Sequence, residues 1–490
     1  MFANYRLISS ATCWVLGIGS LLATVACGNG GSLVLNPSTG SFSKSSLKGS
    51  YVYQIHGASV VNGIVYRQVG VFTADGAGNI TGGVDDSSAN SAGVAVSGSY
   101  TVSQDGTGFI NMTTSVGTIN LGITLVDSSK VYLIEADAAL NASGIAELQD
   151  STAIKTSPTG TFAFRLHQEA SAQNRNAAAS QVGAFTVSST TANGTMDQNT
   201  GGTFVTDALT PSFNSPGSLG RGTGSFLDST ANFTTRFVYY IVTSGKLVLL
   251  VATPGAVGSG SAELQSGTVA TGLSGSYAFG SQGDDAFSIY GVATVGQFNA
   301  SAASIHGVED VAQDGNYSAG VSISACYSSQ ASGRVVVTNC SSASPIQVFW
   351  MVSPSRAMFL DINGTTVQDG TADLMTVNSF SASTLKGQFA IVMGGLDLTP
   401  ELLSRAGALQ LDGAQKAVLT ELVNASATFS GGQTPGTLSG SYVVASGGRS
   451  MVSLNSGSLN LVLYSVSASS AYILQANAGF ITSGTMGLQQ

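Results

Sequence analysis

The sequence predicts an all-β protein of four tandem antiparallel domains. Three short markers recur in the same order at intervals of roughly 110 residues. Between them, short runs rich in Val, Ile, Thr, Tyr and Phe alternate with turns containing Gly, Asn and Asp, and no amphipathic helical run of ordinary length occurs. Because a meander of short strands can close and lose its edges, we expect each domain to be an eight-stranded up-and-down barrel. A two-sheet β-sandwich is the alternative.

The first element is an N-terminal segment that predicts export. Arg6 is the only charged residue among the first 26, residues 7–26 are apolar or small, and Thr24, Val25 and Ala26 precede Cys27. This pattern is typical of a secretory signal peptide over residues 1–26. Small residues before Cys resemble a bacterial lipoprotein lipobox, although Thr24 stands where Leu is usual. The resemblance implies acylation of Cys27, and an ordinary signal peptide with an incidental Cys is the alternative.

The next element, residues 27–46, is predicted to be a flexible tether because residues 28–32 read Gly-Asn-Gly-Gly-Ser. Gly28 after the Cys, in place of Asp, resembles lipoproteins sorted to the outer membrane. We therefore expect an exported protein that contacts the outer membrane through its lipid anchor. The expected location is the periplasmic or the cell-surface face.

Four repeats fill the rest of the chain, at residues 47–157, 158–272, 273–384 and 385–490. Each repeat opens on a Gly-x-Tyr/Phe motif, continues through a Val-Gly-x-Phe type motif and closes on a Glu-Leu-Gln type motif. The opening glycines are Gly49, Gly160, Gly275 and Gly387, so the steps between them are 111, 115 and 112 residues.

The strands expected in the first repeat show how each unit is built. They cover residues 49–56, 65–73, 79–84, 94–103, 108–114, 118–126, 131–136 and 144–148. The runs 131–134, 247–250, 357–360 and 472–474 are apolar at every position. A strand facing water on one side should alternate, so we expect a neighbouring repeat to cover these strands.

The opening Gly-x-Tyr/Phe motif faintly resembles the first strand of lipocalin-like and avidin-like barrels. The fuller pattern, with Phe72-Thr-Ala-Asp-Gly-Ala-Gly-Asn79 and the closing Glu-Leu-Gln, resembles uncharacterised tandem-repeat β lipoproteins of bacteria. That resemblance covers nearly all of the chain after the signal peptide and implies no known activity.

Composition narrows the function classes. Only 9% of the 490 residues are charged and 43% are hydrophobic, which excludes intrinsic disorder. The 17 basic and 26 acidic residues give a net charge of −9, and no basic run occurs, so a nucleic-acid partner is excluded.

Two cysteines remain in the repeats, Cys326 and Cys340. Their midpoint, Gly333, lies in a turn-like segment, so a hairpin there would place the two thiols opposite each other. An exported context favours a disulfide, and two free buried thiols are the alternative.

Acidic residues recur at one spacing. Asp85, Asp197, Glu309 and Glu421 are each 112 residues apart, with Asp86 and Asp310 beside two of them. The favoured interpretation is structural, with each acid accepting backbone N–H groups at a turn. A weak Ca²⁺ site is a second hypothesis and a glycosidase-like carboxylate pair a third, so no metal site and no cofactor is predicted firmly.

Other candidate chemistry is sparse. His56 and His167 share one place in repeats 1 and 2, where repeats 3 and 4 have Gln282 and Gly394, and His306 stands elsewhere. We interpret the histidines as polar strand-end residues, because no further ligand lies at a metal-site spacing. No nucleophile elbow, phosphate-binding loop or zinc-protease motif occurs, so we expect no enzyme.

The sequence therefore predicts a lipid-anchored extracytoplasmic protein with a non-catalytic role in binding, adhesion or envelope structure. Repetition would supply multivalency for an envelope or extracellular polymer. A carrier of small apolar ligands inside the barrels is the first alternative. A glycan-directed enzyme is the second.

Overall fold

The computed structural model describes residues 41–60, 63–169, 178–285, 291–362, 364–397, 402–425 and 435–490. The predicted signal peptide 1–26, the lipidation site Cys27 and the tether up to residue 40 lie outside the described residues.

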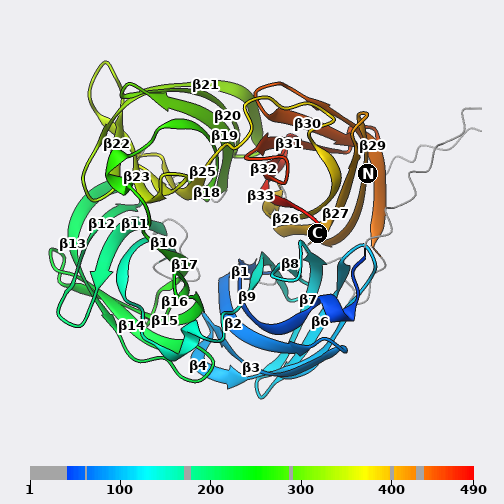
Figure 1. Cartoon of the computed structure of the whole chain (residues 1–490), viewed down its shortest axis with the longest axis horizontal. Helices are drawn as coiled ribbons and strands as arrows, with labels where there is room; N and C mark the ends of the chain where they lie inside the picture. The colour runs from blue at the N-terminus through cyan, green and yellow to red at the C-terminus, as the bar shows by residue number, and fades with distance from the viewer. Residues whose placement is uncertain are drawn as a thin grey trace, which may run out of the picture. The chain divides into compact units, whose positions relative to one another are not determined.

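The predicted fold class is confirmed, since the described chain is nearly all β and forms four closed eight-stranded antiparallel barrels, one per repeat (Figure 1). The strands of barrels 2, 3 and 4 pair in sequence order, and the first and last strands pair to close each barrel. In barrel 1 the pairing of β2 with β3 and of β1 with β9 closes the same cycle.

The strands have the following bounds. Barrel 1 contains β1 (Lys48–Ser59), β2 (Val65–Asp75), β3 (Asn79–Ser87), β4 (Asn90–Ala95), β5 (Ser97–Val102), β6 (Thr107–Thr114), β7 (Gly117–Leu125), β8 (Lys130–Glu135) and β9 (Leu140–Leu148). Barrel 2 contains β10 (Gly160–Glu169), β11 (Ala178–Val187), β12 (Ala192–Thr200), β13 (Thr203–Phe213), β14 (Arg221–Asp228), β15 (Phe233–Thr243), β16 (Lys246–Val251) and β17 (Val257–Leu264).

Barrel 3 contains β18 (Gly275–Asp285), β19 (Gly291–Ser301), β20 (Ser304–Gln313), β21 (Asn316–Ser329), β22 (Arg334–Thr338), β23 (Pro345–Ser353), β24 (Arg356–Asp361) and β25 (Thr366–Leu374). Barrel 4 contains β26 (Lys386–Asp397), β27 (Leu402–Asp412), β28 (Lys416–Ala425), β29 (Gly436–Val444), β30 (Arg449–Leu454), β31 (Leu459–Ser465), β32 (Ser470–Gln475) and β33 (Phe480–Leu488). The described ranges also contain the one-turn 3-10 helices η1 (Lys44–Ser46), η2 (Ala153–Lys155), η4 (Val269–Thr271) and η5 (Asn455–Gly457).

The eight strands expected in repeat 1 are all present, with one difference. The run 94–103 is divided at Val96 between β4 and β5, both of which pair with β3. Val96 itself is buried in the barrel core. Val96 is outside both strands, while the flanking segments keep their pairing with β3.

Residues before the first strand pack against barrel 1, which shortens the predicted tether. Phe42 is buried in the core of barrel 1, and η1 follows it directly. The hydroxyl of Tyr100 donates to the carbonyls of Lys44 and Leu47, at 2.9 and 2.8 Å. Residues 41–46 therefore belong to the barrel rather than to a flexible tether.

Side chains fill the barrel interiors. Each barrel has its own cluster of buried apolar residues, with stacked aromatic pairs such as Tyr51–Phe72, Phe162–Phe185 and Tyr277–Phe298 in barrels 1, 2 and 3. Packing of this kind stabilises each barrel and leaves most of its interior closed to ligands.

A second set of apolar clusters lies between barrels and covers the strands that are apolar at every position. Val238, Tyr240 and Leu250 of barrel 2 pack on Val52 and Val71 of barrel 1. Equivalent clusters join barrel 2 to barrel 3, barrel 3 to barrel 4, and barrel 4 to barrel 1. The expected cover by a neighbouring repeat is thus confirmed, and the contacts form a closed four-barrel cycle.

The closing Glu-Leu-Gln markers connect each barrel to the next. The side-chain amides of Gln149, Gln265 and Gln489 donate to the carbonyls of Ile241, Met351 and Leu125, each at 2.7 Å. The third repeat has Met375 at this place, where the backbone N–H of Thr376 donates to Val466 at 3.0 Å. Each barrel thus contacts the next through the same kind of head-to-tail interface, and such interfaces form a closed ring when the rotation between neighbours allows it.

Cys326 and Cys340 form a disulfide, with Cα atoms 5.0 Å apart. The hairpin register differs from the prediction, because Cys326 pairs with Thr338 rather than with Cys340. The turn is tight, since the N–H of Gln330 donates to the carbonyl of Arg334. Cys340 consequently lies in the loop after β22.

Candidate functional site

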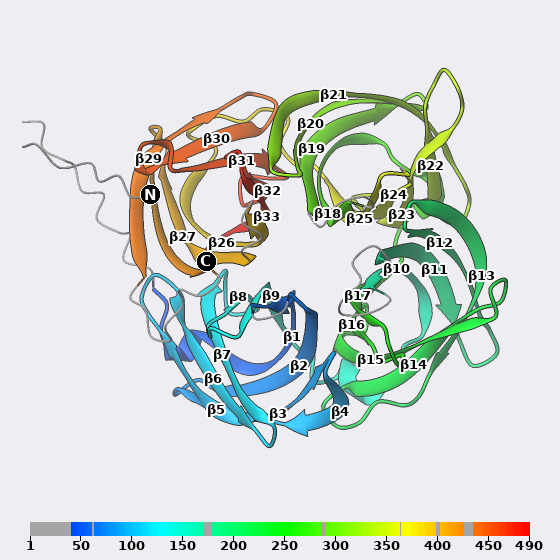
Figure 2. The ribbon, with the colours of Figure 1, turned by 180° about the vertical axis from the view of Figure 1, so that it is seen from behind.

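A cavity of about 800 Å³ lies where the four barrels meet, and residues of all four line it. Most of its wall comes from the first and last strands of each barrel. These strands lie around the centre of the ring of barrels in Figures 1 and 2. We call it the central cavity.

Side chains alternate between the two faces along the first strand of each barrel, and this alternation places polar side chains in the wall. In β1, Tyr51 and Tyr53 belong to the barrel core, so Gln54 and His56 face the central cavity. The equivalent places hold His167 in β10, Gln282 in β18 and Gly394 in β26, and all of them line the cavity. The histidines are therefore wall residues of a shared space, while His306 is exposed elsewhere.

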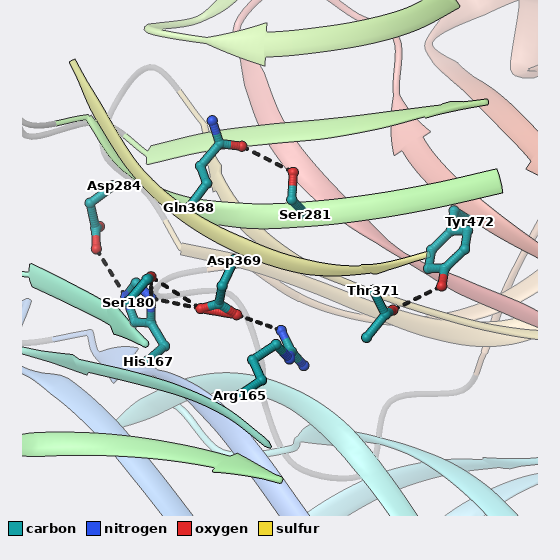
Figure 3. Close-up of polar contacts among 9 residues, drawn as sticks. All are labelled: Arg165, His167, Ser180, Ser281, Asp284, Gln368, Asp369, Thr371 and Tyr472. Atoms are coloured by element: carbon teal, nitrogen blue, oxygen red, sulfur yellow. Dashed lines mark hydrogen bonds and ion pairs between the residues drawn. The ribbon is translucent and has the colours of Figure 1, made fainter. Parts of the chain in front are cut away.

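A charged cluster joins barrels 2 and 3 at this wall (Figure 3). His167 Nε2 lies 3.2 Å from Asp284, and Nδ1 lies 3.2 Å from Asp369. Arg165 contacts the other oxygen of Asp369 at 2.7 Å. Burial alone would lower the pKa of His167, but its hydrogen bonds to the two carboxylates raise it to about 10. Burial opposes ionisation of Asp369, yet Arg165 and His167 together hold its pKa at about 2.

The cluster contains Ser180, His167 and Asp369, the residue types of a nucleophilic triad. In a triad, Ser and Asp meet opposite nitrogens of the imidazole. Here Ser180 Oγ is 2.8 Å from Nδ1, the nitrogen that also faces Asp369, and it donates to Asp369 at 3.1 Å. With its pKa near 10, His167 is protonated at neutral pH and accepts no proton from Ser180. The arrangement is an ion-pair network between barrels.

His56 has the opposite electrostatic character. Enclosure by protein, followed by the charges of Arg67 and Arg165, lowers its pKa to about 4. His56 lines the central cavity, and its imidazole stays neutral at physiological pH. A neutral imidazole offers one donor and one acceptor to a ligand.

The acids of the closing markers form further links across the wall. Arg356 of barrel 3 contacts Glu263 of barrel 2 at 2.8 Å and Asp373 of its own barrel at 2.7 Å. Lys246 contacts Glu147 of barrel 1 at 2.5 Å. These charges satisfy one another, so the other groups of the wall are mainly uncharged amides, hydroxyls and His56, with Arg67 and Lys130 as two further cations.

The prediction that the four acids share one structural place is wrong for repeat 2, where Asp197 is one residue away from that place. Asp85, Glu309 and Glu421 stand opposite the marker glycines Gly70, Gly296 and Gly407, and they face barrel interiors. Asp197 instead pairs with Val182 and faces outward. Its structural equivalents are Asp86 and Asp310. The four predicted residues are thus in four barrels and on two different faces.

Neither the Ca²⁺ hypothesis nor a carboxylate pair gains support from this placement. Asp197 is bound by a guanidinium group, and Arg405 makes an ion pair with Glu421 at 2.8 Å. Within the described ranges, no group of three or more His, Cys, Asp or Glu residues is arranged to hold a metal ion. Ca²⁺ binding stays an untested prediction.

The outward acids reveal functional residues that the sequence interpretation missed. Arg221, Arg334 and Arg449 bind Asp86, Asp197 and Asp310 of the preceding barrel, with contacts of 2.6 to 2.8 Å. An aromatic residue donates to each acid as well, from Tyr240, Trp350 and Tyr464. A recurring Gly-Arg dipeptide, at 220–221, 333–334 and 448–449, was the available signal.

The described residues contain no helix that is both long and apolar enough to cross a membrane.

Comparison with known proteins leaves the family open. No protein-family model matches the sequence, and no curated protein matches it. Among solved structures, a mutant of the vaccine antigen transferrin binding protein B from Haemophilus parasuis Hp5 is 11% identical, covering 74% of this chain and 84% of that chain. Intact Ap-TbpB, with N and C lobes, is 10% identical and covers 76% and 86%. Both have a TM-score of 0.18, which assigns no ligand or activity to this chain.

Proposed function

We propose that this protein is a non-catalytic binding protein of the cell envelope that holds a hydroxyl-rich ligand, such as a segment of an extracellular polymer, in the central cavity. The observation that carries the proposal is the lining of that cavity. The four repeats contribute equivalent positions to it, but with different side chains, such as His56, His167, Gln282 and Gly394. Non-identical walls around a single space suit one asymmetric ligand.

This proposal replaces the multivalent binding expected from repetition. The outward strands of each barrel contact its neighbours, so the repeats build one body rather than four independent modules. The mutual pairing of charges in the wall argues for recognition by hydrogen bonds to uncharged groups. The ionised His167 and the buried Ser180 argue against acyl transfer or hydrolysis.

Saturation-transfer NMR with a panel of short neutral and acidic oligosaccharides tests the proposal on the chain from residue 27 onward. Ser261 lines the cavity, so Ser261→Trp should remove any binding. Thr210 is exposed on β13, and Thr210→Trp serves as the control that keeps it. Binding that survives Ser261→Trp contradicts the site, and release of shortened products contradicts the non-catalytic role.

We also propose that the chain is exported and anchored to the outer membrane through lipid on Cys27. The apolar segment before a Cys and the Gly-rich residues after it support this. Palmitate labelling in cells should be lost in Cys27→Ser. Labelling that persists in this variant contradicts acylation at Cys27.

A further inference from the structure

Barrel 3 differs from the other barrels at one interior position. The strands β6, β14, β22 and β30 occupy the same place in the four barrels. Five residues after the first residue of this strand, barrels 1, 2 and 4 have Met112, Phe226 and Leu454, all almost completely buried in the core. Barrel 3 has Asn339 at this place, and Asn339 is exposed. A large apolar side chain is therefore missing from one end of the barrel 3 interior.

The short fifth strand and the disulfide explain this difference. Strand β22 ends at Thr338, whereas β14 runs for eight residues. The Asn339 side chain accepts hydrogen bonds from the N–H and hydroxyl of Ser341, at 2.9 and 2.7 Å. The bond between Cys326 and Cys340 fixes the next residue to β21. Asn339 is thus held in the loop and cannot turn inward.

A cavity of about 230 Å³ occupies the vacated end of barrel 3. Its wall is mainly apolar and contains four phenyl rings, from Phe279, Phe298, Phe349 and Phe359. Ile346 lines the cavity and is also 37% exposed, so the cavity reaches the surface beside this residue. An engineered cavity of about 150 Å³ is large enough for benzene, so this one has room for an aromatic ring with a short chain.

One carboxyl group, that of Glu309, faces this apolar space. The equivalent Asp85 accepts hydrogen bonds from Tyr53 and Gln68, the equivalent Glu421 pairs with Arg405, and barrel 2 has Met196 there. Within the part of the chain that the structure describes, the carboxyl group of Glu309 has no hydrogen bond or ion pair, although its backbone pairs in β20. Thr294 stands where barrel 4 has Arg405, and its hydroxyl donates to Gln368 instead.

We propose that the interior of barrel 3 binds a small apolar amine, with the ammonium group against Glu309 and the hydrocarbon among the four phenyl rings. An ammonium ion would supply the counter-charge that Arg405 supplies in barrel 4. The phenyl rings would bury the apolar body of the ligand and favour its cationic end electrostatically. The site is separate from the central cavity, so it does not depend on the function proposed above.

Isothermal titration of the chain from residue 27 onward with 2-phenylethylamine tests this inference. Ethylbenzene serves as the neutral ligand of similar shape and phenylacetate as the anionic one. We expect the amine to bind at least tenfold more tightly than ethylbenzene, and phenylacetate most weakly. Glu309→Gln should remove the preference for the amine while keeping the affinity for ethylbenzene.

Two further variants locate the site. Ala325 lines the cavity, so Ala325→Leu should fill it and weaken both the amine and ethylbenzene. Glu421→Gln, at the same position in barrel 4, should leave amine binding unchanged. The proposal is overturned if the native chain does not bind the amine at millimolar concentration, if Glu309→Gln keeps the preference, or if Ala325→Leu keeps the affinity. The ranking of the three ligands needs no variant, so it decides the question even if a substitution prevents folding.

Discussion

Two adjacent carboxylates in β3 have opposite environments. Asp86 faces outward and is bound by Arg221 at 2.7 Å. Asp85 faces the barrel core, where burial raises its pKa from 3.8 to about 6 despite hydrogen bonds from Tyr53 and Gln68. Two adjacent residues of one strand, on opposite faces, thus give an ion-paired acid and an acid that is costly to ionise.

The raised pKa of Asp85 predicts how stability depends on pH. The folded chain holds this proton more tightly than the unfolded chain, so its contribution is present below about pH 4 and is lost as the pH rises through 6. A shift of about 2 units corresponds to about 3 kcal/mol. As the pH rises from 4 to 7, the unfolding free energy of Asp85→Asn should rise by about 3 kcal/mol relative to that of the native chain. Urea unfolding at both pH values measures this, and parallel pH profiles would contradict it.

His167 predicts a second pH dependence, with a different window. Because its folded pKa is raised from 6.5 to about 10, its contribution is complete below pH 6.5 and is lost as the pH rises towards 10. We expect His167→Gln to lose a few kcal/mol of unfolding free energy at pH 6 and much less at pH 10. His56→Gln is the control, since the lowered pKa of His56 places its own effect between pH 6.5 and 4. An equal loss for His167→Gln at both pH values would show that its charge is irrelevant.

At the scale of strands, the repeat pattern was sufficient to predict the elements and the barrel class. Alternation of core and outward residues could be predicted as well, because it depends on neighbours along the chain. The contacts across barrels could not, since Asp197 and Arg334 are 137 residues apart and nothing local indicates that β12 and β22 meet. The central cavity and the barrel 3 cavity were missed for the same reason.

The link between β12 and β22 predicts a strong substitution effect. Asp197 is completely buried and receives hydrogen bonds from Arg334 and from the indole of Trp350. Arg334→Met would leave a buried charge without its counter-charge, which costs about 3–5 kcal/mol. Arg236 is exposed on β15, so Arg236→Met should change stability by less than about 0.5 kcal/mol.

Trp350 fluorescence and urea unfolding measure this effect together. The only other Trp of the chain is Trp14, in the predicted signal peptide, so emission reports the interface of barrels 2 and 3. Arg334→Met should shift the emission of the folded state as well as its stability. A change in stability of the same size in both variants would contradict the assignment.

At the scale of the whole described chain, the closed cycle of contacts has one unusual interface. Barrels 4 and 1 have Leu422 and Thr107 where the other interfaces have Asp and Arg. Among the described residues, this interface has no such ion pair and depends on buried asparagines, a contact that Asn199 also makes between barrels 2 and 3. Asn424 donates to the carbonyls of Glu135 and Leu140, at 2.8 and 3.0 Å. These bonds and the apolar cluster around Leu422 hold the cycle closed.

Opening this interface should change the cooperativity of unfolding. In an open row of repeats each unit is stabilised only by its neighbours, so the terminal units unfold first. Closure gives barrels 1 and 4 two neighbours each, and we expect circular dichroism and Trp350 fluorescence of the native chain to report one coincident transition. The double variant Asn141→Ala/Asn424→Ala would strand buried backbone carbonyls at a cost of about 1–3 kcal/mol for each side chain removed. Circular dichroism should then fall before Trp350 emission changes, because barrels 2 and 3 retain their interface. Coincident transitions in the double variant would show that closure between barrels 4 and 1 does not govern the stability of the cycle.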